Sequence, residues 1–198
     1  MRRFGKLAAV GAALALLLSG CGQARLPESV SATTLAVDAD GGLTYYLVEE
    51  FGREYYDLAE LAAMAKEETE SFRGAEGGVS LEKVERTENA PDQVSLVYRF
   101  EKGESFSKFT GSSFFFGTVS EALELGYDPG EGLRSLRDGA VQNREQLAQN
   151  GEKRLIITDA RALIYCPAGI AALKGAELAE DGSVDASGAE EAVWILLK

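Results

Sequence analysis

The stretch TLAVDADGGLTYYLVEE, residues 34–50, carries the pattern that decides the fold. Residues 34–37 alternate in polarity, and residues 43–50 are rich in the β-branched and aromatic residues that strands favour. Between them, residues 38–42 (Asp-Ala-Asp-Gly-Gly) have the composition of a turn, because Asp and Gly adopt the backbone conformations that tight turns need. The stretch therefore predicts a β-hairpin.

The residues after this hairpin predict the clearest helix of the chain. Asp57 precedes it and Glu60 follows three residues later, an arrangement that resembles a capping box. Gly74 is expected to end the helix, as glycine often does. Residues at helical spacing form one face, with charged residues opposite; that face comprises Leu58, Leu61, Ala62, Ala65, Thr69 and Phe72. Such a helix, about four turns long, would cover one face of a sheet.

Further strands and short helices complete the pattern. The remaining predicted elements are a hairpin of 79–88 and 93–100 joined by 89–92, a helical turn at 105–109, a buried strand at 114–116, a short helix opened by Thr118 and Glu121, and strands at 154–158, 162–166 and 192–197, the last entering the sheet. Residues 127–152 give conflicting signals, because Gly139 interrupts a near-helical spacing. Hairpins interleaved with two or three helices predict one α+β domain over 32–198 with a largely antiparallel sheet.

Composition excludes several kinds of chemistry. The chain has 198 residues, no His, and 32 Asp plus Glu against 20 Lys plus Arg, for a net charge of −12. Without His there is no Ser-His-Asp triad, Cys-His dyad or His-ligated metal. The acidic balance argues against nucleic acid as a partner, since binding requires Lys and Arg to neutralise phosphates.

The first twenty residues have the organisation of a secretory signal. Arg2, Arg3 and Lys6 precede an apolar run, residues 7–18, that is too short to span a bilayer as a helix. The run ends in Leu18-Ser19-Gly20-Cys21, which resembles the lipobox of bacterial lipoproteins. The alternatives are an ordinary signal peptide with an accidental Cys and a membrane helix that is retained.

The lipobox resemblance implies a lipid anchor and a location. In that family a diacylglycerol, carrying fatty acids such as palmitate, is attached to the Cys, and a peptidase removes the preceding residues. Residues 1–20 would be lost and Cys21 lipidated, with residues 21–31 as a flexible tether. The protein is then expected at the outer face of the bacterial cytoplasmic membrane. Loss of three basic residues would change its net charge from −12 to −15.

The body of the chain also resembles a group of proteins. The paired Tyr residues followed by a helix, and the run Phe-Phe-Gly-Thr-Val at 115–119, are similar to small uncharacterised lipoproteins of Gram-positive-type bacteria. That resemblance implies the same location and brings no assigned chemistry.

Two short motifs suggest chemistry, and each has a simpler interpretation. Ser105 and Lys108 form an S-x-x-K pattern, which resembles the nucleophile motif of penicillin-binding proteins, but the Ser-Asp-Asn and Lys-Thr-Gly elements are missing. A surface turn with Phe106 and Phe109 facing inward explains the same residues. The stretch from Asp38 resembles the start of a calcium loop, yet its sixth position is Leu43 instead of Gly and Glu49 fits its twelfth only by count. A hairpin turn is the simpler explanation, and we predict no metal site and no cofactor.

Carboxylate and aromatic pairs are the other candidates. Glycoside hydrolysis needs two carboxylates and no His; the adjacent acid pairs are Glu49-Glu50, Glu67-Glu68 and Glu190-Glu191. Tyr45-Tyr46 and Tyr55-Tyr56 suggest a sugar- or peptide-binding face, although on strands one member of each pair normally enters the core. Cys166 lies on an apolar strand and is expected to be buried and inert.

These observations favour a binding module over an enzyme. We expect a membrane-anchored extracytoplasmic lipoprotein of the cell envelope, held through the lipid on Cys21, whose partner is an envelope protein or a small ligand. The main alternative is a small carboxylate-dependent hydrolase acting on cell-wall glycan or peptide. A third possibility is a purely structural spacer. No residue is assigned a catalytic role.

Overall fold

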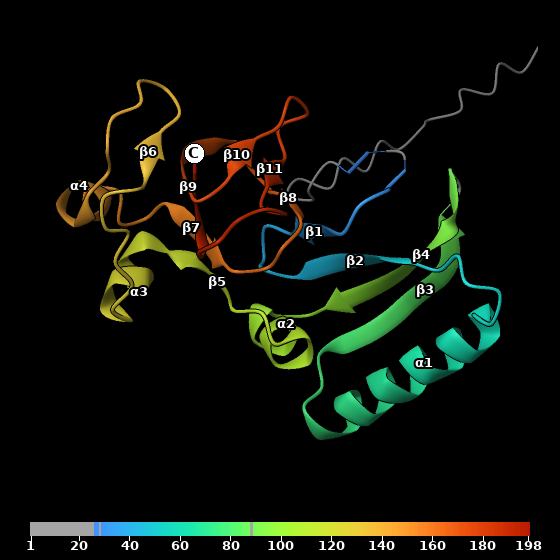
Figure 1. The fold of residues 1–198 in the computed structure, drawn as a ribbon. Coiled ribbons are helices and arrows are strands. Elements are labelled where there is room, and N and C mark those ends of the chain that lie inside the picture. The colour runs from blue at the N-terminus through green and yellow to red at the C-terminus, as the bar shows by residue number, and fades with distance from the viewer. Residues whose placement is uncertain (1–25, 28, 88) are drawn as a thin grey trace, which may run out of the picture.

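The computed structural model describes residues 26–27, 29–87 and 89–198, so the lipobox, Cys21 and the predicted signal peptide lie outside the described residues. The described chain folds into two mostly antiparallel sheets with four helices (Figure 1). The α+β fold predicted from the sequence is thus confirmed. One sheet is mixed, because one of its strand pairs is parallel.

The first sheet has seven strands in the order β10-β11-β8-β1-β2-β4-β3. Its members are β1 Thr34–Val37, β2 Leu43–Glu50, β3 Val79–Thr87, β4 Ala90–Phe100, β8 Leu163–Tyr165, β10 Glu177–Leu178 and β11 Val184–Asp185. The predicted first hairpin is present, with Val37 opposite Leu43. Gly41 takes φ +87° in its turn, a conformation that favours glycine. The parallel pair joins β1 to β8.

The second sheet has five antiparallel strands in the order β5-β7-β12-β9-β6. They are β5 Phe114–Thr118, β6 Arg134–Ser135, β7 Arg154–Thr158, β9 Ile170–Lys174 and β12 Val193–Leu197. The predicted strand at 192–197 is therefore the central strand of this second sheet, between β7 and β9. All five residues of β12 are buried, because both faces of this sheet are covered.

The helices are α1 Leu58–Ala75, α2 Gly103–Thr110, α3 Val119–Glu124 and α4 Arg144–Ala148. The Asp57 side chain caps α1 by accepting hydrogen bonds from the backbone N–H groups of Ala59 and Glu60. The Thr118–Glu121 capping box opens α3 as predicted. Gly74 does not end α1, because the helix continues to Ala75 and its C-cap, Glu76, still donates to helix carbonyls.

The structure differs from the sequence-based prediction, or adds to it, in three regions. The second hairpin has a tighter turn than expected, because β4 begins at Ala90 and includes residues 91–92. Residues 127–152 form mainly loops, with β6 and the short helix α4, which an Asn143 capping box opens. The short strands β9, β10 and β11 were not predicted. The apolar run 170–173 was an available signal for β9, whereas β10 and β11 have only two residues each and carry no such pattern.

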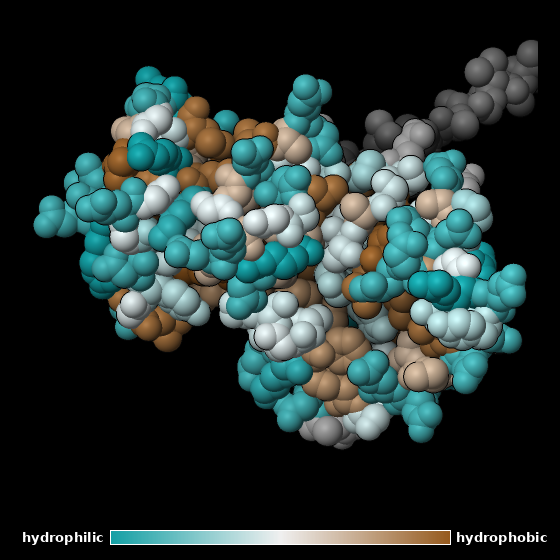
Figure 2. Space-filling view, viewed as in Figure 1, coloured by the Kyte–Doolittle hydropathy of each residue, from teal (hydrophilic) through white to brown (hydrophobic). Residues whose placement is uncertain are grey.

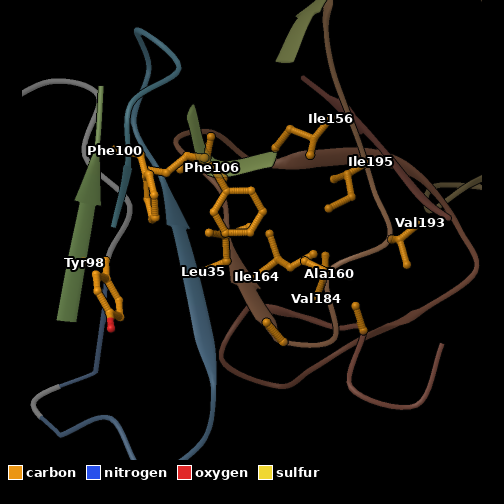
Figure 3. Packing of buried hydrophobic residues seen from close by; sticks show 14 of the residues in the cluster. Leu35, Tyr98, Phe100, Phe106, Ile156, Ala160, Ile164, Val184, Val193 and Ile195 are labelled. Carbon is orange, nitrogen blue, oxygen red and sulfur yellow. The ribbon is translucent and has the colours of Figure 1, made fainter. Parts of the chain in front are cut away.

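The main core lies between the two sheets. Figure 3 shows Leu35 and Ile164 of the first sheet facing Ile156 and Ile195 of the second, with the Phe106 ring of α2 among them. A second cluster fills the other face of the five-stranded sheet beneath α3 and α4. None of the helices in the described part of the chain is both long and apolar enough to cross a membrane.

Candidate functional site

The position of α1 leaves part of the first sheet uncovered. This helix packs chiefly against β3, the edge strand, at the end of the molecule opposite α3 and α4 (Figure 1). The second sheet and α2 cover the same face farther along, over β1 and β8. Between these two coverings the ends of β2 and β4 form the floor of an open groove of about 750 Å³.

Most of the groove lining is apolar. The floor comes from β2, β4 and the residue after β2, and one wall comes from α1; the apolar lining residues are Leu47, Phe51, Leu61, Met64, Ala65, Val94 and Leu96. Met64 is 62% exposed, which is high for so apolar a side chain. Figure 2 shows apolar side chains at the surface among charged ones over this end of the molecule. The groove therefore offers an apolar ligand a surface that no described residue covers.

Three carboxylates border this apolar floor. Glu49 comes from β2, and Glu67 and Glu68 come from α1. The fold thus brings together members of two of the three acid pairs found in the sequence. Glu190 and Glu191 lie elsewhere, exposed in the loop before β12. An acidic border on an apolar groove attracts cations and apolar groups together.

Tyr98 is the tyrosine of the groove floor. Tyr98 as a whole is only 4% exposed, and Figure 3 shows its hydroxyl pointing away from the other labelled core residues. No described residue forms a hydrogen bond with this hydroxyl. Because it is not among the fully buried unpaired atoms of the described residues, the hydroxyl reaches the surface of the groove. Burial, with a contribution from the Glu68 carboxylate, raises the pKa of Tyr98 to about 12. The phenol is therefore a neutral O–H that is free to pair with a ligand.

An aromatic group extends the groove at one end. The Tyr56 ring stacks on Phe51 with ring centroids 5.0 Å apart, and Tyr55 meets Tyr56 edge-on at 4.9 Å. Tyr55 is 78% exposed, so the expectation that one member of each Tyr pair enters the core is wrong for this pair. The reason is that both residues lie in the turn before α1 and not on a strand. In the other pair, Tyr45 packs edge-on against Phe106.

A second hollow, of about 680 Å³, lies on the opposite face of the same sheet under residues 29–31. It contains Thr87 Oγ1, which is the buried side-chain polar atom left without a partner among the described residues. Its cations are already engaged: Arg86 donates to the Pro91 carbonyl at 2.6 Å, and Lys83 pairs with Glu85 at 2.6 Å. This hollow therefore offers a ligand less than the groove does.

The S-x-x-K motif lies on α2, away from the groove. Lys108 Nζ contacts carboxylates of Glu76 at 2.6 Å and Glu104 at 3.2 Å, and these contacts raise the pKa of Lys108. Activation of a Ser nucleophile by Lys needs the opposite shift, toward a neutral amine. Phe106 is buried and Phe109 packs against the core, as the simpler interpretation expected, although the segment is a two-turn helix.

The Asp38–Gly42 stretch is the turn of the first hairpin. Asp40 Oδ1 accepts from the Gly42 N–H, and Asp38 Oδ2 accepts from Arg99 at 3.0 Å. These oxygens therefore stabilise the turn and tie it to β4. In the part of the chain that the structure describes, no group of three or more acidic or Cys side chains is placed to hold a metal ion.

Other titratable groups have structural partners. Burial raises the pKa of the Cys166 thiol to about 12, which keeps it protonated and matches the inert thiol expected from the sequence. Among the described residues, every carboxyl group with a clearly displaced pKa has it lowered by hydrogen bonds in caps and turns; these groups are Glu121, Asp138, Asp181 and Asp185. A general acid of a glycosidase needs a raised pKa instead.

Comparisons with protein-family models, with curated proteins and with solved structures find no significant match for this chain. The groove is therefore interpreted from its own residues. Sequence analysis singled out Glu49, Glu67 and Glu68, but it did not identify Met64, Tyr98 or their common groove. The only available signal was the weak amphipathic pattern of α1, in which Met64 interrupts the charged side.

Proposed function

We propose that this chain is a lipid-anchored envelope lipoprotein that acts as a binding module, with the groove between α1 and the β2–β4 floor as its binding site. The observation that carries the binding function is the open apolar groove bordered by Glu49, Glu67 and Glu68. The anchor and the location rest on the lipobox at residues 18–21. A diacyl anchor at Cys21 would keep the groove close to the membrane surface, where envelope partners concentrate.

The hydrolase alternative also has one supporting observation, because three carboxylates border the same groove. However, the space between them is lined by Leu, Val and Met side chains, which suit an apolar ligand better than a glycan. Replacement of Glu49, Glu67 and Glu68 by Gln, each singly, tests this alternative. Loss of a hydrolytic activity on wall glycan or peptide in any of them would favour the enzyme.

Crosslinking in cells tests the binding function directly. The full chain and its Cys21→Ala variant are crosslinked in the native host, and captured proteins are identified by mass spectrometry. One stoichiometric partner, lost when the anchor is removed, is the expected result. A partner captured equally by Cys21→Ala would contradict the role of the anchor.

Two matched variants locate the contact. Met64→Gln removes an exposed apolar side chain from the groove, whereas Leu125→Gln removes one that is 69% exposed on the far side, after α3. Both keep the charge and change a side chain that contributes little to the core. We expect Met64→Gln to reduce capture at least about fivefold, the equivalent of about 1 kcal/mol, and Leu125→Gln to have no effect. Equal capture by both variants would place the binding site elsewhere.

A further inference from the structure

We infer that the ligand of the groove is an amphipathic helix of a partner protein that carries Lys or Arg along one flank. This inference deepens the proposed function and depends on it. It rests on four features of the described residues: the space beside α1, the lack of free backbone groups in the groove, the acidic border and the unpaired Tyr98 hydroxyl.

The space beside α1 has the dimensions of a short helix. From Leu61 to Ser71, the groove wall covers eleven residues of helix, and the ten steps between the first and the last span about 15 Å at 1.5 Å per step. The floor from Val94 to Tyr98 covers a similar length, about 14 Å of strand. Because α1 lies over the edge strand, a second helix could pack next to it over β2 and β4. About three turns of helix fill that length.

The groove offers an extended peptide no backbone partners. Its floor is the face of a sheet, where N–H and C=O groups already pair between β2 and β4, and its wall is the side of a helix. A ligand buried there must satisfy its own backbone hydrogen bonds. A helix does so internally and presents side chains at i, i+3, i+4 and i+7 to an apolar groove. The exposed Met64 side chain suits such a contact, because Met adapts to the shape of its partner.

The border favours a basic flank. Glu67 and Glu68 are exposed on α1, and Glu49 is exposed on β2, so carboxylates stand on both sides of the floor. Lys66, the nearby cation of α1, is 3.8 Å from Glu70 and does not line the groove. A second copy of this chain, with its net charge of −12, is a poor partner for the same border.

The Tyr98 hydroxyl adds a polar contact at the floor. It is a neutral donor beside Glu68 with no described partner. A ligand side chain that bridges Tyr98 and Glu68 would pair both groups, which an apolar ligand alone would leave unpaired. A Lys or Arg at the end of the helix interface provides donors for the carboxylate.

Designed peptides test the inference on the full chain purified in detergent. The probe is a fluorescent peptide of about three turns, constrained to a helix by a side-chain lactam, with Leu at i, i+3, i+4 and i+7 and Lys on one flank. One control replaces each Lys by Glu, and another places Pro at the centre to break the helix. Affinity is measured by fluorescence anisotropy.

Charge reversal on the protein provides the matched control. Glu67→Lys with Glu68→Lys reverses two carboxylates of the groove, whereas Glu124→Lys with Glu177→Lys makes the same charge change at exposed sites that do not line it. We expect the basic helix to bind. Its affinity should fall about tenfold in the groove variant only, because that variant replaces two attractive charge pairs by repulsive ones. The acidic and Pro-containing peptides should bind at least about tenfold more weakly.

Each contrary result would overturn one specific part of the inference. Equal binding of acidic and basic helices would contradict the basic flank, and equal binding of the Pro peptide would contradict the helix. Equal losses in both charge variants would show that only net charge matters. None of these results would affect the crosslinking experiment with Met64→Gln, so the inference can fail while the proposed function stands.

Discussion

The five-stranded sheet and the α1 end of the seven-stranded sheet are covered to different degrees. Both faces of β12 are buried, one by the other sheet and one by α3, α4 and their loops. At the other end, α1 covers β3 and leaves β2 and β4 to form the floor of an open groove. Apolar residues buried on both faces stabilise the fold, whereas those left open on one face are available to a partner. The comparison therefore distinguishes residues that stabilise the fold from residues that are available to bind a partner.

The largest effect is expected in the fully covered sheet. Trp194 is 5% exposed and packs in the second cluster, with its ring 6.2 Å from that of Tyr127. Trp194→Ala should lower the free energy of unfolding by about 3–5 kcal/mol, because it removes a large side chain and leaves a cavity. Guanidinium unfolding followed by far-UV circular dichroism measures the change. A loss below about 1 kcal/mol would show that this sheet is loosely packed.

A smaller effect is expected in the groove floor. Leu47 is only partly buried, because the groove exposes it. Leu47→Ala should lower the free energy of unfolding by about 1–2 kcal/mol, in proportion to the smaller area removed from water. The same unfolding measurement applies. If Leu47→Ala were as destabilising as Trp194→Ala, the groove floor would be part of the core and the comparison would fail.

Acid should weaken the far end of the seven-stranded sheet. The Ser183 and Tyr165 hydroxyls donate to Asp181, and these hydrogen bonds lower its pKa from 3.8 to about 2. Since the pKa is lower in the fold, ionised Asp181 stabilises it above about pH 4, and this contribution disappears as the pH falls toward 2. The midpoint temperature of thermal unfolding should therefore decrease less between pH 4 and pH 2 in Asp181→Asn than in the unsubstituted protein. An unchanged pH profile would show that these bonds do not stabilise the fold.

The smallest effect on stability is expected at Tyr98. Its hydroxyl has no hydrogen-bond partner among the described residues, so Tyr98→Phe should change the free energy of unfolding by less than about 0.5 kcal/mol. Binding of the basic helical peptide should nevertheless weaken about threefold to tenfold, the loss of one hydrogen bond. A loss of binding without a loss of stability would show that the Tyr98 hydroxyl serves the groove and not the core. A large loss of stability would assign the hydroxyl a structural role.

Local signals in the sequence predicted the elements, but not their arrangement. The hairpin at 34–50 and the start of α1 were predicted because turn residues, alternation and an N-cap act within a few positions. The parallel contact of β1 with β8 joins residues more than a hundred positions apart, and no local pattern indicates it. The groove depends on which strand α1 covers, and the helix pattern shows only that one of its faces is apolar. Sequence analysis could therefore name Glu67 and Glu68 without placing them beside Glu49.

The central place of β12 has a consequence for the order of folding. Residues 193–197 lie between β7 and β9 but follow both in the sequence, whereas β3 and β4 are consecutive along the chain and pair with each other. As the chain emerges from a ribosome, β3 and β4 can pair early. The facing edges of β7 and β9 stay open until β12 arrives, and open edges invite pairing with other chains. The five-stranded sheet, the most completely covered part of the finished molecule, thus has open strand edges that can aggregate while the protein is being made.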